Sequence, residues 1–182
     1  YFNTKLYTGT GSSNALTGVG FQPDWVWIKN RDAAEAHSLY DAVRGTQKVI
    51  YSNLTNAQAT ETNGLSSFDS DGFTVGSSGA INGSSQNIAS WNWKANGSGS
   101  SNTDGNLTST VSANTTAGFS IVKYTSDGSG TTIGHGLGVE PDVILLKNTS
   151  QAENWVGNFS AIHSASGNGN NLYLNLTNAN GS

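Results

Sequence analysis

Cysteine and methionine are both absent from the 182 residues of the sequence. Without cysteine the chain can form no disulfide, which is how many small extracellular domains compensate for a limited core. Its stability must therefore come from core burial, repetition or oligomerisation. Because there is no Met and no signal peptide at the start, we expect Tyr1 to begin a mature product or an excerpt rather than a newly translated chain.

Charge and long apolar runs are also scarce. Charged residues make up 11% of the chain, against about 25% in an ordinary domain. The formal net charge is −4 and the sequence pI is about 5.1, so the chain lacks the basic footprint of a nucleic-acid-binding protein. No apolar run approaches the roughly 18–20 residues that cross a bilayer, so membrane insertion is not expected.

Aromatic residues are plentiful, with 5 Trp, 6 Tyr and 6 Phe among many Gly, Ser, Thr and Asn. This mixture favours short strands joined by tight turns over disorder. The one helical candidate is Asp32–Val43, which is expected to form a turn or a short helix. Strands are expected at Phe2–Thr8, Trp25–Asn30, Val49–Asn53, Gly72–Val75, Asn87–Lys94, Phe119–Thr125, Val143–Asn148 and Leu172–Leu176. The sequence therefore predicts an all-β fold of antiparallel β-sandwich or jelly-roll-like modules.

An internal repeat organises the chain. Gly18–Asn30 aligns with Gly136–Asn148 at an offset of 118 residues, and matches continue on both flanks. Identical pairs are Gly20 and Gly138, Pro23 and Pro141, Asp24 and Asp142, and Lys29 and Lys147. The runs that follow each Pro-Asp pair, Trp25–Ile28 and Val143–Leu146, are apolar on both faces, which predicts a central strand covered on both sides.

The repeat sets the expected domain boundaries. Residues 1–95 form a first β-sandwich repeat, residues 96–117 a Gly/Ser/Asn/Thr-rich linker or an added strand, and residues 118–182 a second, incomplete repeat. The second copy has no counterpart of residues 61–94. A domain without those strands would expose a sheet edge, so we expect either that the chain continues beyond Ser182 or that another chain supplies the strands.

Two tryptophans are the strongest binding candidates. Trp91 and Trp93 are two residues apart and therefore share one face of a strand, where an exposed pair could stack on sugar rings. The same spacing would equally place both rings in a core. Trp25 and Trp27 are interpreted as core residues, because aliphatic side chains replace them in the second copy.

Signals for catalysis and metal binding are weak. His37, Ser38 and Asp41 are close in sequence, but a catalytic triad is defined by geometry and no nucleophile motif accompanies them. Asp69 and Asp71 resemble half of a calcium loop, yet no closing Glu follows. The sequence therefore predicts a chain that is not an enzyme, with no catalytic residues and no cofactor, and with Asp69 and Asp71 as weak metal candidates.

Four blocks of the sequence together resemble a known repeat module. They are Gly18–Arg31, Leu39–Gly45, Ser67–Gly76 and Asn82–Ala95, and the resemblance extends over residues 1–95 and about 118–179. The module is found in phage and prophage tail-fibre-like and other virion-surface proteins, often of marine phages. The resemblance implies a lectin-like β-sandwich in a long, often oligomeric appendage. It transfers no catalytic or binding residues.

The expected function is therefore a non-catalytic structural or adhesive module of a phage tail fibre or other virion-surface fibre, used in host-surface attachment. Self-association as a trimer or filament is expected, with a host glycan or receptor as the further partner, at the virion surface or outside the cell. Two alternatives stay open: a bacterial extracellular adhesin or filament subunit, and a carbohydrate-binding, lectin-like module.

Overall fold

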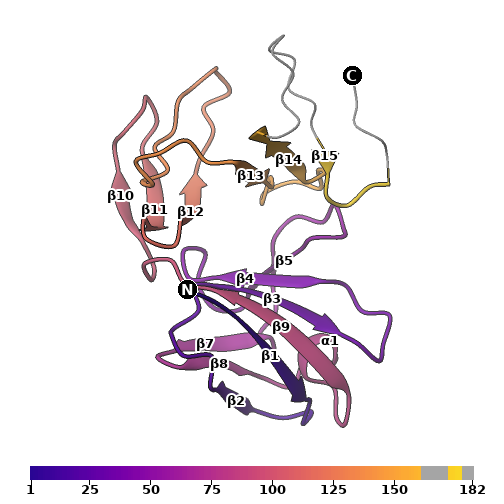
Figure 1. The fold of residues 1–182 in the computed structure, drawn as a ribbon. Coiled ribbons are helices and arrows are strands. Elements are labelled where there is room, and N and C mark those ends of the chain that lie inside the picture. Colours follow the sequence, from indigo (N-terminus) through magenta and orange to yellow (C-terminus); the bar gives the residue numbers. More distant parts are fainter. Residues whose placement is uncertain (161–171, 178–182) are drawn as a thin grey trace.

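A computed structural model gives the fold of the protein and describes residues 1–160 and 172–177 (Figure 1). Among the described residues, strands hold 42% and helix only 3%, and the ladders are antiparallel, which confirms the predicted all-β class. The largest sheet has six strands in the order β1 (Phe2–Thr8), β9 (Asn87–Trp93), β3 (Trp25–Asn30), β4 (Ser38–Asp41), β5 (Lys48–Tyr51) and β6 (Ala59–Thr60).

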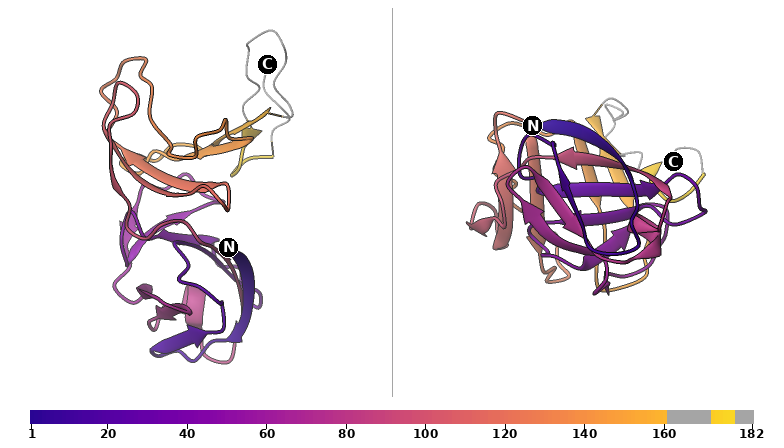
Figure 2. Two further views of the ribbon diagram at one scale, coloured as in Figure 1. Left: turned by 60° about the vertical axis from the view of Figure 1, so that its left-hand side comes forward. Right: turned by 90° about the horizontal axis from the view of Figure 1, so that it is seen from below.

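A small three-stranded sheet covers one face of the six-stranded sheet. Its strands lie in the order β2 (Asn14–Thr17), β8 (Gly72–Val75) and β7 (Leu65–Asp69), and the short helix α1 (Gly79–Asn82) lies beside them (Figure 2). Alternate residues of β3 point into the layer between the two sheets, so Val26 and Ile28 are fully buried there. Tyr40, Phe73 and Ile88 join them in this main core. This part of the chain is sandwich-like.

Two further three-stranded sheets lie on the opposite side of the six-stranded sheet (Figures 1 and 2). One has the order β10 (Ser100–Asn102), β11 (Ser109–Asn114) and β12 (Phe119–Tyr124). The other has the order β13 (Val143–Leu146), β14 (Val156–Phe159) and β15 (Leu172–Tyr173). The six-stranded sheet is therefore the middle layer of the molecule and carries side chains that pack on both of its faces.

The sequence repeat has a counterpart in strand register. Trp25 pairs with Asp41 and Ile28 with Ser38 in the β3–β4 ladder, and the residues 118 positions later pair in the same way. The later pairs are Val143 with Phe159 and Leu146 with Val156. Gly18 and Gly20 have φ of +83° and +88°, and their counterparts Gly136 and Gly138 have +71° and +74°. These left-handed conformations favour Gly, which explains why the glycines recur.

Three predictions made from the sequence concern the strands β3 and β13 and residues 96–117. β3 is an interior strand with neighbours on both sides, as predicted, whereas β13, among the described residues, lies at the edge of its sheet and differs from its prediction as a covered central strand. Ile144 and Leu146 are both exposed. Residues 96–117, expected as a linker or an added strand, contain β10 and β11.

The helical candidate Asp32–Val43 is also corrected. It holds no helix; its second half contains strand β4, whose four residues are all buried. Burial on both faces removes the polar–apolar alternation by which a strand is usually found in sequence. Among the described residues, no helix has the length and hydropathy needed to span a membrane.

Candidate functional site

Four tryptophans line the face of the six-stranded sheet that is turned away from the main core. Trp25 lies directly opposite Trp93 in the β3–β9 ladder, and Trp27 lies opposite Trp91. Cross-strand partners share a face, so the four rings form one surface, here called the tryptophan stripe. The ring centroids are 4.9 Å apart for Trp25 and Trp93 and 6.1 Å apart for Trp27 and Trp91. All four side chains are half-buried.

One end of the tryptophan stripe packs against β12. The Phe119 ring lies 5.5 Å from Trp25 at an interplanar angle of 12°, and 6.2 Å from Trp93 at 24°. Phe2 also reaches Trp93, with 4.9 Å between centroids. Offset stacking of this kind adds to the free energy gained by burying the rings. Trp93, a candidate for glycan stacking, thus has aromatic neighbours from three other strands.

A second contact lies further along the same sheet face. Trp155 is only 4% exposed and packs with Leu39 and Ile50. Its indole Nε1 donates a hydrogen bond of 2.7 Å to the carbonyl oxygen of Tyr51. Leu145 packs against the same cluster. Together with the stack of Phe119 on Trp25 and Trp93, this cluster forms what we call the aromatic seam between residues 1–95 and the later strands.

The other end of the stripe contacts fewer rings. The Trp27 indole Nε1 donates a 3.2 Å hydrogen bond to His37 Nδ1. Burial and, secondarily, the positive charge of Lys29 lower the pKa of His37, which favours the neutral imidazole that can accept this bond. Among the described residues, Trp91 makes its ring contact with Trp27. Leu6, on the same face of β1, is 65% exposed, so Trp91 borders a partly exposed apolar surface.

Asp69 and Asp71, the weak metal candidates, are both held by protein donors. Asp71 accepts backbone hydrogen bonds of 2.9 Å from Gly18 and 2.6 Å from Gly20, and these bonds lower its pKa. Asp69 accepts a 2.7 Å bond from the Thr74 hydroxyl. In this arrangement Asp71 fastens the positive-φ turn at Gly18 and Gly20 to the β7–β8 hairpin. Within the described residues, no group of three metal-ligating side chains is present.

His37, Ser38 and Asp41 do not meet in a triad. Ser38 is fully buried opposite Ile28, and its hydroxyl has no hydrogen-bond partner among the described residues, whereas His37 faces Trp27 on the other side of the sheet. Asp41 forms a buried ion pair with Arg44. The Arg44 guanidinium also donates to the carbonyl oxygens of Lys48 and Leu39, so this pair ties the turn after β4 to β5.

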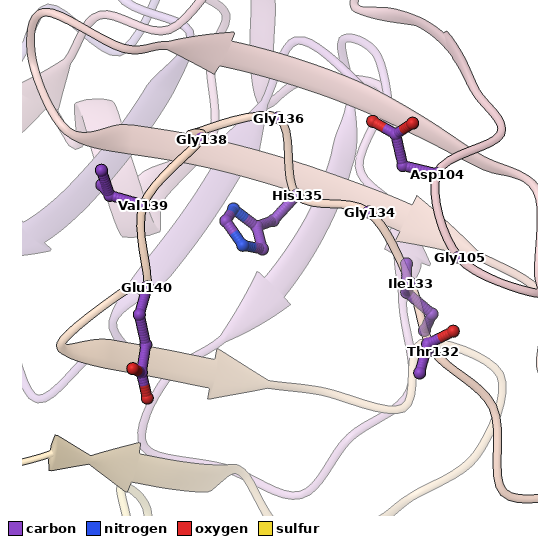
Figure 3. A pocket seen from close by; sticks show the side chains of 10 residues that line it. All are labelled: Asp104, Gly105, Thr132, Ile133, Gly134, His135, Gly136, Gly138, Val139 and Glu140. Atoms are coloured by element: carbon purple, nitrogen blue, oxygen red, sulfur yellow. The ribbon is translucent and has the colours of Figure 1, made fainter.

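An open pocket of about 440 Å³ lies in the later part of the chain, where the backbone supplies much of the lining (Figure 3). Its polar side chains do not converge, since Asp104 and Glu140 point in different directions in Figure 3. His135 Nδ1 accepts a 3.2 Å bond from the Leu137 amide, so this imidazole fastens its own turn. The lining residues are Asp104, Gly105, Thr132, Ile133, Gly134, His135, Gly136, Gly138, Val139 and Glu140.

Comparison with protein families matches residues 1–182 to the domain of unknown function DUF7483. The chain belongs to this family. Neither the comparison with curated proteins nor that with solved structures gave a match. Membership in DUF7483 therefore describes the whole chain but assigns it no activity, and the function has to be argued from the geometry.

Sequence reasoning identified the stripe in part and missed the residues that cover it. Trp25, Trp27, Trp91 and Trp93 stand out by their spacing, but the DUF7483 sequence carries no local sign that Phe119 would reach them. Trp155 was also missed, since a single Trp in a polar segment has no periodicity to interpret. The alignment of Phe119 with Phe2 in the sequence repeat was the one available clue.

Proposed function

We propose that the chain is a non-catalytic structural and adhesive module of a phage tail fibre or another virion-surface fibre, acting at the virion surface in attachment to the host. It contains tandem copies of one β-sandwich-like module, the first in residues 1–95 and the second beginning at about residue 118. The observation that carries the proposal is the aromatic seam, in which Trp25 and Trp93 of the first copy stack on Phe119 of the second.

The seam supports a structural role because it joins the two copies stiffly. Neighbouring domains usually meet through polar interfaces and move relative to one another. Here the junction holds stacked rings, the buried Trp155 side chain with its bond to the Tyr51 carbonyl, and a 2.9 Å backbone bond from Gln58 to the Thr149 carbonyl. A fibre that places a receptor-binding end at a fixed distance requires joints of this kind.

The shared register supports the tandem architecture. The hairpin β13–β14 reproduces the pairing of β3–β4 residue by residue, and the glycine turns before β3 and β13 adopt the same left-handed conformations. In repeat proteins each unit contacts its neighbours, and length grows by adding units. The absence of Cys and the low charge are compatible with an array that works outside the cell and relies on packing.

Two measurements test this proposal. Light scattering of the purified chain should show a defined homo-oligomer, a trimer or a filament. Gold-labelled antibodies raised against the chain should decorate fibres on virions in electron micrographs. Decoration of bacterial cell surfaces without labelled virions would instead support the adhesin alternative. If the chain is a monomer and the antibodies label neither virions nor cells, both the fibre and the adhesin readings are overturned.

Carbohydrate binding is the second candidate, and the position of Trp91 favours it. Its ring lies on the same sheet face as the exposed Leu6, at the end of the stripe away from Phe119. A sugar face stacking there should quench tryptophan fluorescence saturably and without effect on the oligomer. Trp91→Ala should abolish the quenching, whereas Trp25→Phe, within the aromatic seam, should retain it. A glycan array on which the protein binds nothing would remove this candidate.

A further inference from the structure

His37 and Trp155 occupy equivalent positions in the sequence repeat but carry different side chains. They are 118 residues apart, and His37 directly precedes β4 as Trp155 directly precedes β14. The amide of each donates a 2.8 Å hydrogen bond to the side-chain oxygen of an asparagine, Asn53 for His37 and Asn175 for Trp155. The same backbone position therefore accommodates an imidazole or an indole, so the turn itself does not require a titratable group.

The neighbour of each side chain differs in the same way. His37 Nδ1 accepts the 3.2 Å bond from Trp27 Nε1, and the two rings meet edge to face with 6.0 Å between their centroids. At the position that corresponds to Trp27, the later strand carries Leu145, which packs in the same apolar cluster as Trp155. The earlier contact is thus polar and contains a titratable nitrogen, whereas the later one is apolar.

We propose that His37 is an acid-sensitive switch, which holds Trp27 against the aromatic seam while the imidazole is neutral and releases it when the imidazole takes up a proton. The neutral ring has one donor and one acceptor nitrogen, and the bond from Trp27 makes Nδ1 the acceptor. A proton added at Nδ1 turns both ring nitrogens into donors, so two N–H groups then face each other and the bond is lost. The proposal does not depend on whether the chain belongs to a fibre.

A fixed positive charge beside His37 opposes its protonation. Lys29 lies on the same face of β3 as Trp27, and its ammonium donates to the carbonyl oxygens of Asn30 and Ala33 in the turn that follows. Its position is therefore set by the backbone. Burial of the imidazole and, secondarily, this charge lower the pKa of His37.

The remaining ionisable side chains on the neighbouring elements have other partners or are exposed. Glu35 is exposed in the loop before β4, and its charge acts on Tyr51. Asp41, at the far end of β4, is paired with Arg44. The ionisable side chains on these elements other than Lys29 are Arg31, Asp32, Glu35, Asp41, Lys48, Tyr51 and Glu153.

These effects set the direction in which the switch responds to pH. Because the pKa of His37 lies below the ordinary 6.5 in the folded chain, the neutral imidazole favours folding. That stabilisation is fully present above about pH 6.5 and is lost as the pH falls through the folded-state value. Ordinary Asp and Glu side chains have pKa values near 4, so they are still ionised where this loss begins.

Trp27 connects the switch to the joint with the later strands. It packs against the apolar cluster around Trp155. The Trp155 indole donates to the carbonyl oxygen of Tyr51, and the next amide along the chain, that of Ser52, donates to the His37 carbonyl oxygen. Release of the Trp27 indole removes packing beside Trp155, so the joint should loosen in acid.

The test is a pH titration of the ¹⁵N-labelled chain from about pH 7.5 to about pH 4.5, which spans the usual range of histidine. NMR follows the imidazole of His37 and the indole N–H signals, with Trp27→Phe and Trp155→Phe used for assignment. We expect both indole signals to shift along one curve with the midpoint of His37, below about pH 6.5. In His37→Asn, whose amide offers an acceptor but takes no proton, both signals should stay constant. His135→Asn, which removes a histidine from another turn, should keep the native curve.

Three outcomes in the native chain would overturn the switch. In the first, His37 titrates while the Trp27 indole signal stays in place. In the second, the Trp27 signal follows His37 but the Trp155 signal does not move, which removes the coupling to the seam. In the third, His37 has taken up no proton by about pH 4.5. All three are read without a variant at His37, so they hold even if His37→Asn fails to fold.

Discussion

Phe119 lies nearly parallel to Trp25, with 12° between the ring planes and 5.5 Å between the centroids. Trp25 belongs to β3 of the six-stranded sheet, and Phe119 belongs to β12, so this stack joins parts of the chain that are distant in sequence. The tryptophan stripe therefore has two environments. The Trp25–Trp93 end is an internal joint, and the Trp27–Trp91 end borders the surface.

Replacing Phe119 should weaken the joint more than the fold of either part. Phe→Ala in a full core costs about 3–5 kcal/mol, and because Phe119 is half-buried we expect about 1–3 kcal/mol for Phe119→Ala. Urea unfolding followed by tryptophan fluorescence measures this loss. Nitroxide labels on Ser12→Cys and Thr103→Cys, the only thiols in the chain, should report a narrow distance distribution that the variant broadens. Val139→Ala, at an exposed site, is the matched control and should change neither the free energy of unfolding nor the distance distribution.

Trp155 contributes to the same joint by packing and by one hydrogen bond. Trp155→Phe keeps an aromatic ring but removes the Nε1 donor to the Tyr51 carbonyl, which should cost about 0.5–1.5 kcal/mol because that carbonyl keeps only the longer 3.4 Å bond from the Leu54 amide. Trp155→Ala also removes the contacts with Leu39 and Ile50 and should cost about 3–5 kcal/mol. Equal unfolding midpoints for the two variants would show that the hydrogen bond, and not the packing, dominates.

The sequence predicted the strands whose apolar residues stand out from polar turns. Phe2–Thr8, Trp25–Asn30 and Gly72–Val75 agree with β1, β3 and β8 to the residue. β4 was not predicted as a strand because it is buried on both faces, and residues 96–117 were predicted only as a linker or an added strand because β11 is made of Ser, Thr, Val, Ala and Asn without clear alternation. Residue spacing predicted that Trp91 and Trp93 share one face of a strand, but not that Trp25 and Trp27 lie beside them on the same sheet face. What covers the stripe was not predicted either, because the stack on Phe119 depends on how two sheets are placed in space.

Asp71 makes stability depend on pH in the acid range. The amides of Gly18 and Gly20 donate to its carboxylate and lower its pKa below the ordinary value of 3.8. A lowered folded-state pKa means that the stabilisation is fully present above the unfolded-state value and is lost as the pH falls through the folded-state value. The denaturation midpoint of the native chain should therefore decrease as the pH is lowered below about 4. Asp71→Asn should reduce that dependence, whereas Glu140→Gln, an exposed carboxylate elsewhere, should leave it intact.

The ion pair of Asp41 and Arg44 should be the most sensitive polar contact within residues 1–95. Both side chains are 7% exposed, so removing one partner leaves a buried charge, and such a loss costs about 3–5 kcal/mol. Arg44→Met should show this cost in urea unfolding. Arg44→Lys keeps the charge but cannot reproduce the planar fork that donates to Asp41, Lys48 and Leu39. Its free energy of unfolding should therefore lie between that of Arg44→Met and that of the native chain.

A double variant separates the two contributions of this pair. Asp41→Asn/Arg44→Met removes both charges, so the penalty of an unpaired carboxylate disappears and the chain should be more stable than with Arg44→Met alone. Arg31→Met, at an exposed position, is the matched control and should change the free energy of unfolding by less than about 0.5 kcal/mol. If the double variant is no more stable than Arg44→Met, the guanidinium acts mainly through the carbonyl oxygens of Leu39 and Lys48, and its role is to hold the turn after β4 rather than to neutralise Asp41.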